Sequence, residues 1–142
     1  MSTRNFYDPM PGTVTMTHVV YGLHAITIIP SLIASAFFPW GISVGTASIV
    51  GVIINYVLRG DVRGTWLESH FELQILLFWR AILFILAVFI LSFPLIFLGP
   101  IGVGLLWVAG LTFMIWFAWK LITGWRALAM GCLLYTSPSP RD

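Results

Sequence analysis

The sequence predicts an all-α, polytopic membrane protein whose four transmembrane helices are arranged as two helical hairpins. Two long stretches, residues 9–58 and residues 81–119, contain no Lys, Arg, Asp or Glu. A charged side chain at mid-bilayer costs about 2.5 to 3.5 kcal/mol, so a chain that crosses lipid excludes such residues from its spans. Composition agrees, because 59% of the residues are hydrophobic and 8% are charged, whereas about 25% are charged in an average soluble domain.

Each stretch is long enough for two crossings, since about 20 helical residues cover a hydrocarbon core of ~30 Å. Turn-forming residues divide both stretches, with Pro-Trp-Gly at residues 39–41 and Leu-Gly-Pro-Ile-Gly at residues 98–102. Pro30 and Pro94 fall inside the first and third expected helices, where each is expected to bend the helix. The expected transmembrane domain spans residues 17–128. Its helices are predicted at residues 17–38, 41–58, 71–98 and 101–122.

The basic residues predict the orientation, because cytoplasmic loops near helix ends are enriched in Lys and Arg. With four crossings, all of these residues fall on one face of the membrane: Arg4, Arg59, Arg63, Lys120 and Arg126. We therefore expect the N-terminal segment 1–16, the loop 59–70 and the C-terminal tail 129–142 to be cytoplasmic.

The first helix also has a competing interpretation as a cleaved signal peptide, since Ala-Ser-Ala at residues 34–36 has the form that signal peptidase prefers. Only Arg4 is basic in the segment before it, and His18 and His24 interrupt the apolar run. We expect this helix to be retained.

Polar residues of the first helix recur at helical spacing and therefore share one face. Such a face is typical of packing between helices through small or polar groups, and the alternative is a lined cavity or ion path. Arg80, about 9 Å along the third helix from Gln74, either extends to the headgroups or needs a buried partner. An arginine inside a membrane span is a functional candidate by default. The candidate polar seam comprises Tyr21, His24, Ser31, Asn55 and Arg80.

The loop before the third helix has the pattern of a helix start. If Thr65 is the N-cap, Glu68 stands at the third position after it, as in a capping box. Trp66, His70 and Gln74 then share one helical face, four residues apart. Glu68, His70 and Glu72 follow one another at intervals of two residues, which point in different directions on a helix, so they are not expected to bind one metal ion together.

Three segments resemble a known family. They are residues 19–25 (VVYGLHA), residues 52–71, and Gly124-Trp125. The chain resembles a family of small, uncharacterised proteobacterial inner-membrane proteins that are distantly similar to the twenty-kilodalton subunit of the chloroplast Tic translocon. The resemblance implies a multi-pass protein of the bacterial inner (cytoplasmic) membrane, with protein translocation as a distant analogy. Its candidate motif consists of Gly64, Thr65, Trp66, Leu67, Glu68, Ser69, His70, Phe71 and Gln74.

No catalytic cluster or phosphate-binding loop is evident in the sequence, so we expect no enzyme and no cofactor. Cys132 is the only cysteine, which excludes a disulfide within the chain. The last ten residues resemble a translated sequencing adaptor and are given no role. We expect a structural or interaction component whose partners are the lipid bilayer and itself or other membrane proteins, with no nucleic acid. The alternatives are a transporter or protein-translocation subunit, and a haem- or metal-binding protein that uses His18, His24 and His70.

Overall fold

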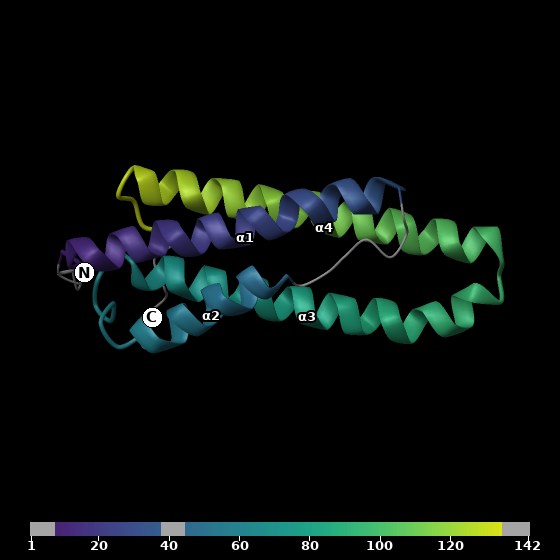
Figure 1. The fold of residues 1–142 in the computed structure, drawn as a ribbon, viewed down its shortest axis with the longest axis horizontal. Helices are drawn as coiled ribbons and strands as arrows, with labels where there is room; N and C mark the ends of the chain where they lie inside the picture. The colour runs from purple at the N-terminus through teal and green to yellow at the C-terminus, as the bar shows by residue number, and fades with distance from the viewer. Residues whose placement is uncertain (1–7, 38–44, 135–142) are drawn as a thin grey trace, which may run out of the picture.

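The computed structural model describes residues 8–37 and 45–134, and this part of the chain is helical without strands (Figure 1). The all-α prediction is confirmed for these residues. Three helices are long and apolar enough to cross a membrane, whereas α2 is a shorter apolar helix of 13 residues. The helices are α1 (Pro11–Phe37), α2 (Thr46–Leu58), α3 (Glu68–Ile96) and α4 (Pro100–Ala129).

The helix ends differ from the predicted ones. α1 begins at Pro11, six residues before the predicted start, because proline is well suited to the first helical position. Gly45 has extended backbone angles, with φ −68° and ψ 151°, so α2 begins at Thr46 rather than at Gly41. α4 continues to Ala129, seven residues beyond its predicted end. The predicted turn at residues 39–41 lies outside the described residues.

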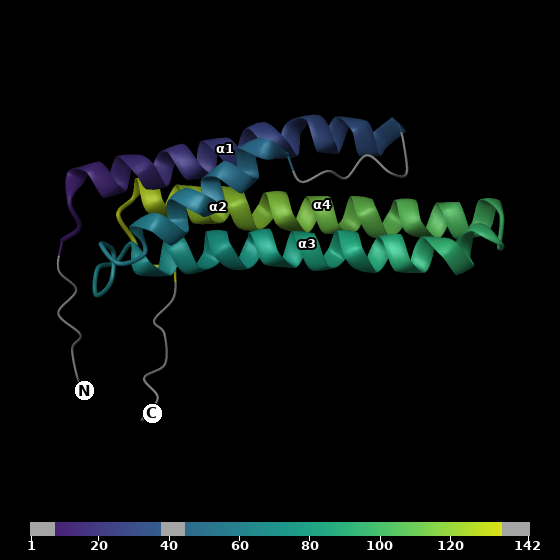
Figure 2. The ribbon, with the colours of Figure 1, turned by 60° about the horizontal axis from the view of Figure 1, so that its bottom comes forward.

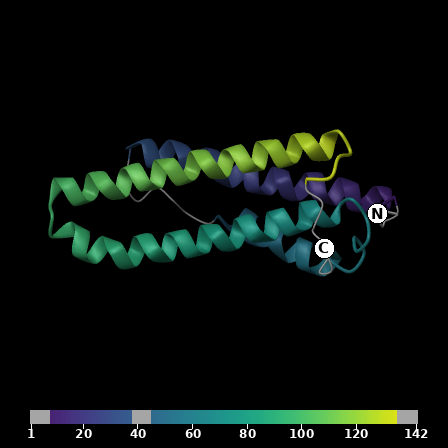
Figure 3. The same cartoon turned by 180° about the vertical axis from the view of Figure 1, so that it is seen from behind.

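Most helix ends lie at one of the two ends of the molecule (Figures 1 and 3). We call one the loop end, where α1 starts, α2 ends, α3 starts and α4 ends. The other is the turn end, where α3 passes into α4. α1 packs against α2 and α4, and α3 packs against α4 and α2. Figure 2 shows α2 running obliquely from alongside α1 toward the start of α3.

A tight connection joins α3 to α4. Leu98 donates its backbone N–H to the carbonyl of Leu95 at 3.0 Å, and Gly99 has a φ of +61°. Few residues other than glycine adopt that backbone conformation. Pro100 then opens α4 at its first position, where the missing N–H costs nothing.

The two ends differ in packing. The hydrophobic core gathers at the loop end, around Tyr21, Leu67, Phe71 and Leu121. At the turn end the large apolar side chains point outward, and four of them are 73–79% exposed: Phe89, Phe93, Phe97 and Ile101. A water-soluble protein rarely displays such a continuous apolar surface, which suits lipid instead.

Candidate functional site

Four of the five residues of the candidate polar seam lie in the interior. Tyr21, His24 and Ser31 from α1 and Asn55 from α2 are all at most 5% exposed. The fifth, Arg80, does not join them, because it lies on the exposed surface of α3. Phe78 faces the interior at 9% exposure, and a residue two positions further along a helix points about 200° away. We use "polar core" for the buried polar side chains that the structure does bring together: Thr17, Tyr21, His24, Ser31, Ser48, Asn55, His70 and Gln74.

His70 connects three parts of the chain at the loop end. Its Nε2 lies 2.9 Å from the backbone carbonyl of Cys132, and its Nδ1 lies 3.1 Å from the hydroxyl of Tyr21. Because a carbonyl only accepts, Nε2–H is the donor to Cys132. In the neutral ring Nδ1 is then the acceptor, and the Tyr21 hydroxyl donates to it. The imidazole therefore joins α1, α3 and the segment after α4.

Aromatic rings extend this connection to α4. The ring of Tyr21 stacks on Trp125, with centroids 6.1 Å apart and planes 11° apart. Trp125 donates its indole N–H to Nδ1 of His18 at 3.0 Å. A Cβ at Gly124 would lie 2.6 Å from the Tyr21 hydroxyl, so the absence of a side chain there lets Tyr21 insert between α3 and α4.

The candidate motif at residues 64–71 forms the turn that starts α3. The predicted capping box with Thr65 as N-cap is wrong, because α3 begins at Glu68 and its N-cap is Leu67. Thr65 donates its hydroxyl to the carbonyl of Val62 at 2.7 Å, and is therefore not free to cap the helix. The Glu68 carboxylate instead accepts the backbone N–H of Gly64 at 3.1 Å, where φ is +76°.

Most of the motif side chains face inward. Trp66 presents its ring edge-on to His70, with centroids 5.8 Å apart. Gln74 is fully buried and donates its amide to the carbonyl of Thr17 at 3.4 Å. The buried members of the motif are Thr65, Leu67, Ser69, His70, Phe71 and Gln74. The motif thus fixes the loop to α1 and to the segment that follows α4.

The segment after α4 was not predicted to contribute. Gly131, with φ +67°, reverses the chain, and Cys132 donates its N–H to the carbonyl of Ala127 at 2.9 Å, as in a Schellman motif. This reversal brings the Cys132 carbonyl to His70, and the Leu134 N–H to the Ser69 hydroxyl at 3.3 Å. The glycine after a helical pattern was the available sequence signal.

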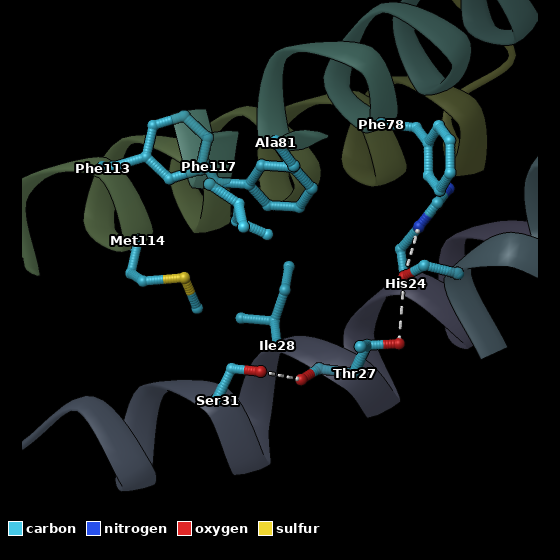
Figure 4. Close-up of a pocket in the computed structure, with 11 residues that line it drawn as sticks. His24, Thr27, Ile28, Ser31, Phe78, Ala81, Phe113, Met114 and Phe117 are labelled. Carbon is cyan, nitrogen blue, oxygen red and sulfur yellow. Dashed lines mark hydrogen bonds between the residues drawn. The ribbon is translucent and has the colours of Figure 1, made fainter. Parts of the chain in front are cut away.

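A small cavity lies beside His24 where all four helices meet (Figure 4). Its volume is about 40 Å³. A water molecule needs roughly 10 to 15 Å³, so the cavity has room for a few water molecules. The lining residues are His24, Thr27, Ile28, Ser31, Ser48, Phe78, Ala81, Ile85, Phe113, Met114 and Phe117.

Hydrogen bonds between residues that line the cavity determine which ring nitrogen of His24 carries the proton. Thr27 donates its hydroxyl to the Leu23 carbonyl at 2.8 Å, and Ser48 donates to the Thr27 oxygen at 3.0 Å. Nδ1 of His24, 3.0 Å from the Ser48 oxygen, is then the donor. Nε2 carries a lone pair, is buried, and has no hydrogen-bond partner among the described residues.

Other buried atoms of the polar core also lack a hydrogen-bond partner among the residues that the structure describes. Within the described chain, neither amide atom of Asn55 has a partner, and neither does the side-chain oxygen of Gln74. A Cβ at Gly51 would lie 3.3 Å from Val20 and 3.7 Å from Nε2 of His24, which places α2 directly against α1. An unsatisfied buried polar atom costs about 1 to 3 kcal/mol, and ordered water commonly satisfies such groups.

The histidines do not converge on one point. His18 bonds to Trp125, His24 to Ser48, and His70 to Tyr21 and Cys132. In residues 8–37 and 45–134, no three His, Cys, Asp or Glu side chains are grouped as metal ligands.

These features define an all-helical protein with three helices suited to crossing a membrane and a polar interior at one end. No family model, curated protein or solved structure matches the chain.

Proposed function

We propose that the chain is an integral protein of the bacterial inner membrane that acts as a structural or interaction component. The observation that carries this proposal is the α3–α4 turn end, where Phe89, Phe93 and Phe97 are 74–79% exposed. Such a surface is stable only in contact with lipid or with other membrane proteins. The resemblance to the Tic-like family of small proteobacterial inner-membrane proteins supports the same location.

We further propose four crossings in two hairpins, α1 with α2 and α3 with α4. α2 itself covers about 20 Å, which is less than the ~30 Å core of a bilayer, but it ends at the loop end, where α1 begins, so the chain returns there as in a hairpin (Figure 2). The exposed basic residues Arg59, Arg63 and Arg126 lie at the loop end, which is therefore assigned to the cytoplasm. A membrane-impermeant maleimide should then reach the exposed Cys132 only after the inner membrane is opened.

Photo-crosslinking tests the interaction role. A photoreactive phenylalanine at Phe93, which is 74% exposed, should form adducts with neighbouring membrane proteins in intact cells, because the described residues leave this face uncovered. Gel shifts and mass spectrometry of the adducts provide the measurement.

The matched control carries the photoreactive phenylalanine at Leu106 on α4, a position that is 3% exposed. This variant should yield no protein adduct. Adducts with lipid alone at Phe93 would contradict an interaction role for this surface.

A second candidate, a transporter or protein-translocation subunit, is favoured by the buried polar atoms of His24, Asn55 and Gln74 that have no hydrogen-bond partner in the described part of the chain. Buried polar groups in a membrane protein typically face a partner or a water-filled space. The polar core runs from His70 at the loop end to Ser31, about 10 Å beyond His24 along α1. It therefore suits part of a path that a neighbouring subunit completes.

Two buried serines allow a matched test of this second candidate. Ser48 lies in the polar core and Ser92 lies in the turn half of α3, and both are 8% exposed. In a chain with Cys132→Ser, we expect Ag⁺ to modify Ser48→Cys at least about ten times faster than Ser92→Cys, because only the first lines the cavity that this candidate fills with water. Equal rates at the two sites would argue against a water-filled polar core, and thus against this candidate.

A further inference from the structure

The charge-free part of the α3–α4 pair has the height of a hydrocarbon core. Residues 81–96 of α3 extend about 24 Å and residues 100–119 of α4 about 30 Å, at 1.5 Å per residue, while the core of a bilayer is ~30 Å thick. Arg80 and Lys120 are the charged residues that bound this part on either helix. If the chain spans the membrane as proposed above, both lie where hydrocarbon gives way to headgroups.

The Arg80 side chain is held on the outer surface at this level. Its guanidinium carbon lies over the ring of Trp116, 5.6 Å from the ring centroid. Arg80 is exposed, and Trp116 belongs to the neighbouring helix α4. A guanidinium that rests on an aromatic face keeps its in-plane N–H donors available for an anion.

Lys120 adds a second cation to the same surface. It is exposed and follows Trp116 by four residues, so both side chains lie on one face of α4, about 6 Å apart along the helix axis. Trp79 and Trp119 are also exposed, by 49% and 67%. Tryptophans of this kind collect at the headgroup level of membranes.

We propose that Arg80, Trp116 and Lys120 form a binding site for the phosphate of an anionic phospholipid in the leaflet at the loop end. Arginine binds phosphate oxygens through two parallel N–H bonds, and the lysine ammonium adds a point charge. Two cations favour a headgroup with net negative charge over a zwitterionic one, whose own ammonium group would be repelled. Nothing in this arrangement requires contact with the polar core.

Lipid retention by the purified full-length protein tests the site. In native mass spectrometry after exchange into phosphatidylglycerol or phosphatidylcholine, the wild-type chain should retain phosphatidylglycerol preferentially. The double variant Arg80→Gln/Lys120→Gln should retain about ten times less phosphatidylglycerol, with phosphatidylcholine unchanged. Inorganic phosphate should not compete, because the acyl chains hold the headgroup at this level.

The control is Arg59→Gln/Arg126→Gln, which removes two exposed cations that the structure does not place on Trp116. This control should keep the wild-type preference. Equal loss in both double variants would mean that only overall charge matters, and would overturn the site. Lys120→Gln alone, an exposed substitution expected to fold, should lower retention about threefold, and no change there would also count against the proposal. Failure of the membrane role itself would appear differently, as a wild-type chain that retains neither lipid.

Discussion

Gly102→Ala is expected to lower the free energy of unfolding by about 1 to 3 kcal/mol, the usual cost of overpacking. A Cβ at Gly102 would collide with the backbone carbonyl oxygen of Leu95 and lie 2.6 Å from its carbonyl carbon. That carbonyl already accepts the N–H of Leu98 within the turn. Because backbone cannot move aside as a flexible side chain can, the turn between α3 and α4 must open. Unfolding in mixed micelles with increasing sodium dodecyl sulfate provides the measurement.

Gly104→Ala, in the same helix, is the matched control. A Cβ at this exposed glycine would meet nothing within 4 Å. Alanine favours helix over glycine by up to about 1 kcal/mol, so this variant should be as stable as the wild type or slightly more so. If both alanine variants retained wild-type stability, the close approach of α4 to Leu95 would be refuted.

The all-helical class could be predicted because lipid imposes a simple rule on composition. Charge excluded from residues 81–119 indicated the α3–α4 pair, and Gly99-Pro100 indicated the turn between them. The helix starts and ends were harder, because they depend on local backbone geometry. Gly45 is extended and Leu67, rather than Thr65, precedes α3, and neither fact follows from the hydrophobic pattern.

The sequence predicted which candidate-site residues share a face of one helix, but not which residues meet between helices. Periodicity placed Tyr21, His24 and Ser31 on one face of α1, and these side chains are buried. Periodicity could not tell which face of α3 points outward, so Arg80 was grouped with residues that it does not approach. The contact of the Arg80 guanidinium with the Trp116 ring depends on how α3 and α4 are aligned along their length, and the charge pattern does not specify that alignment.

The connection through His70 lay beyond sequence reasoning for a different reason. Tyr21 and His70 are 49 positions apart, and the other partner of His70 is a backbone carbonyl 62 positions away. A backbone acceptor leaves no signature in the side chains. The Tyr21 and His70 positions were both singled out, but only the packed fold shows that they bind each other.

His70→Ala is expected to cost more than Gly102→Ala, about 3 to 5 kcal/mol of unfolding free energy. The substitution removes a buried ring and leaves the Tyr21 hydroxyl and the Cys132 carbonyl without their partner. Tyr21→Phe should cost less, about 1 to 3 kcal/mol, because it leaves only Nδ1 of His70 unpaired. Both values come from the same unfolding titration in mixed micelles.

The double variant distinguishes a direct bond from two separate packing effects. Once His70 is absent, the Tyr21 hydroxyl is itself a buried orphan, and removing it should cost nothing or restore some stability. The combined loss should therefore fall short of the sum of the single losses by about 1 kcal/mol or more. Tyr56→Phe is the control, because Tyr56 is 45% exposed and its hydroxyl accepts the indole N–H of Trp79 at the surface. Such a surface change should alter the free energy of unfolding by no more than about 0.5 kcal/mol. Strictly additive losses for Tyr21→Phe and His70→Ala would show that the two side chains stabilise the loop end independently, without a direct bond between them.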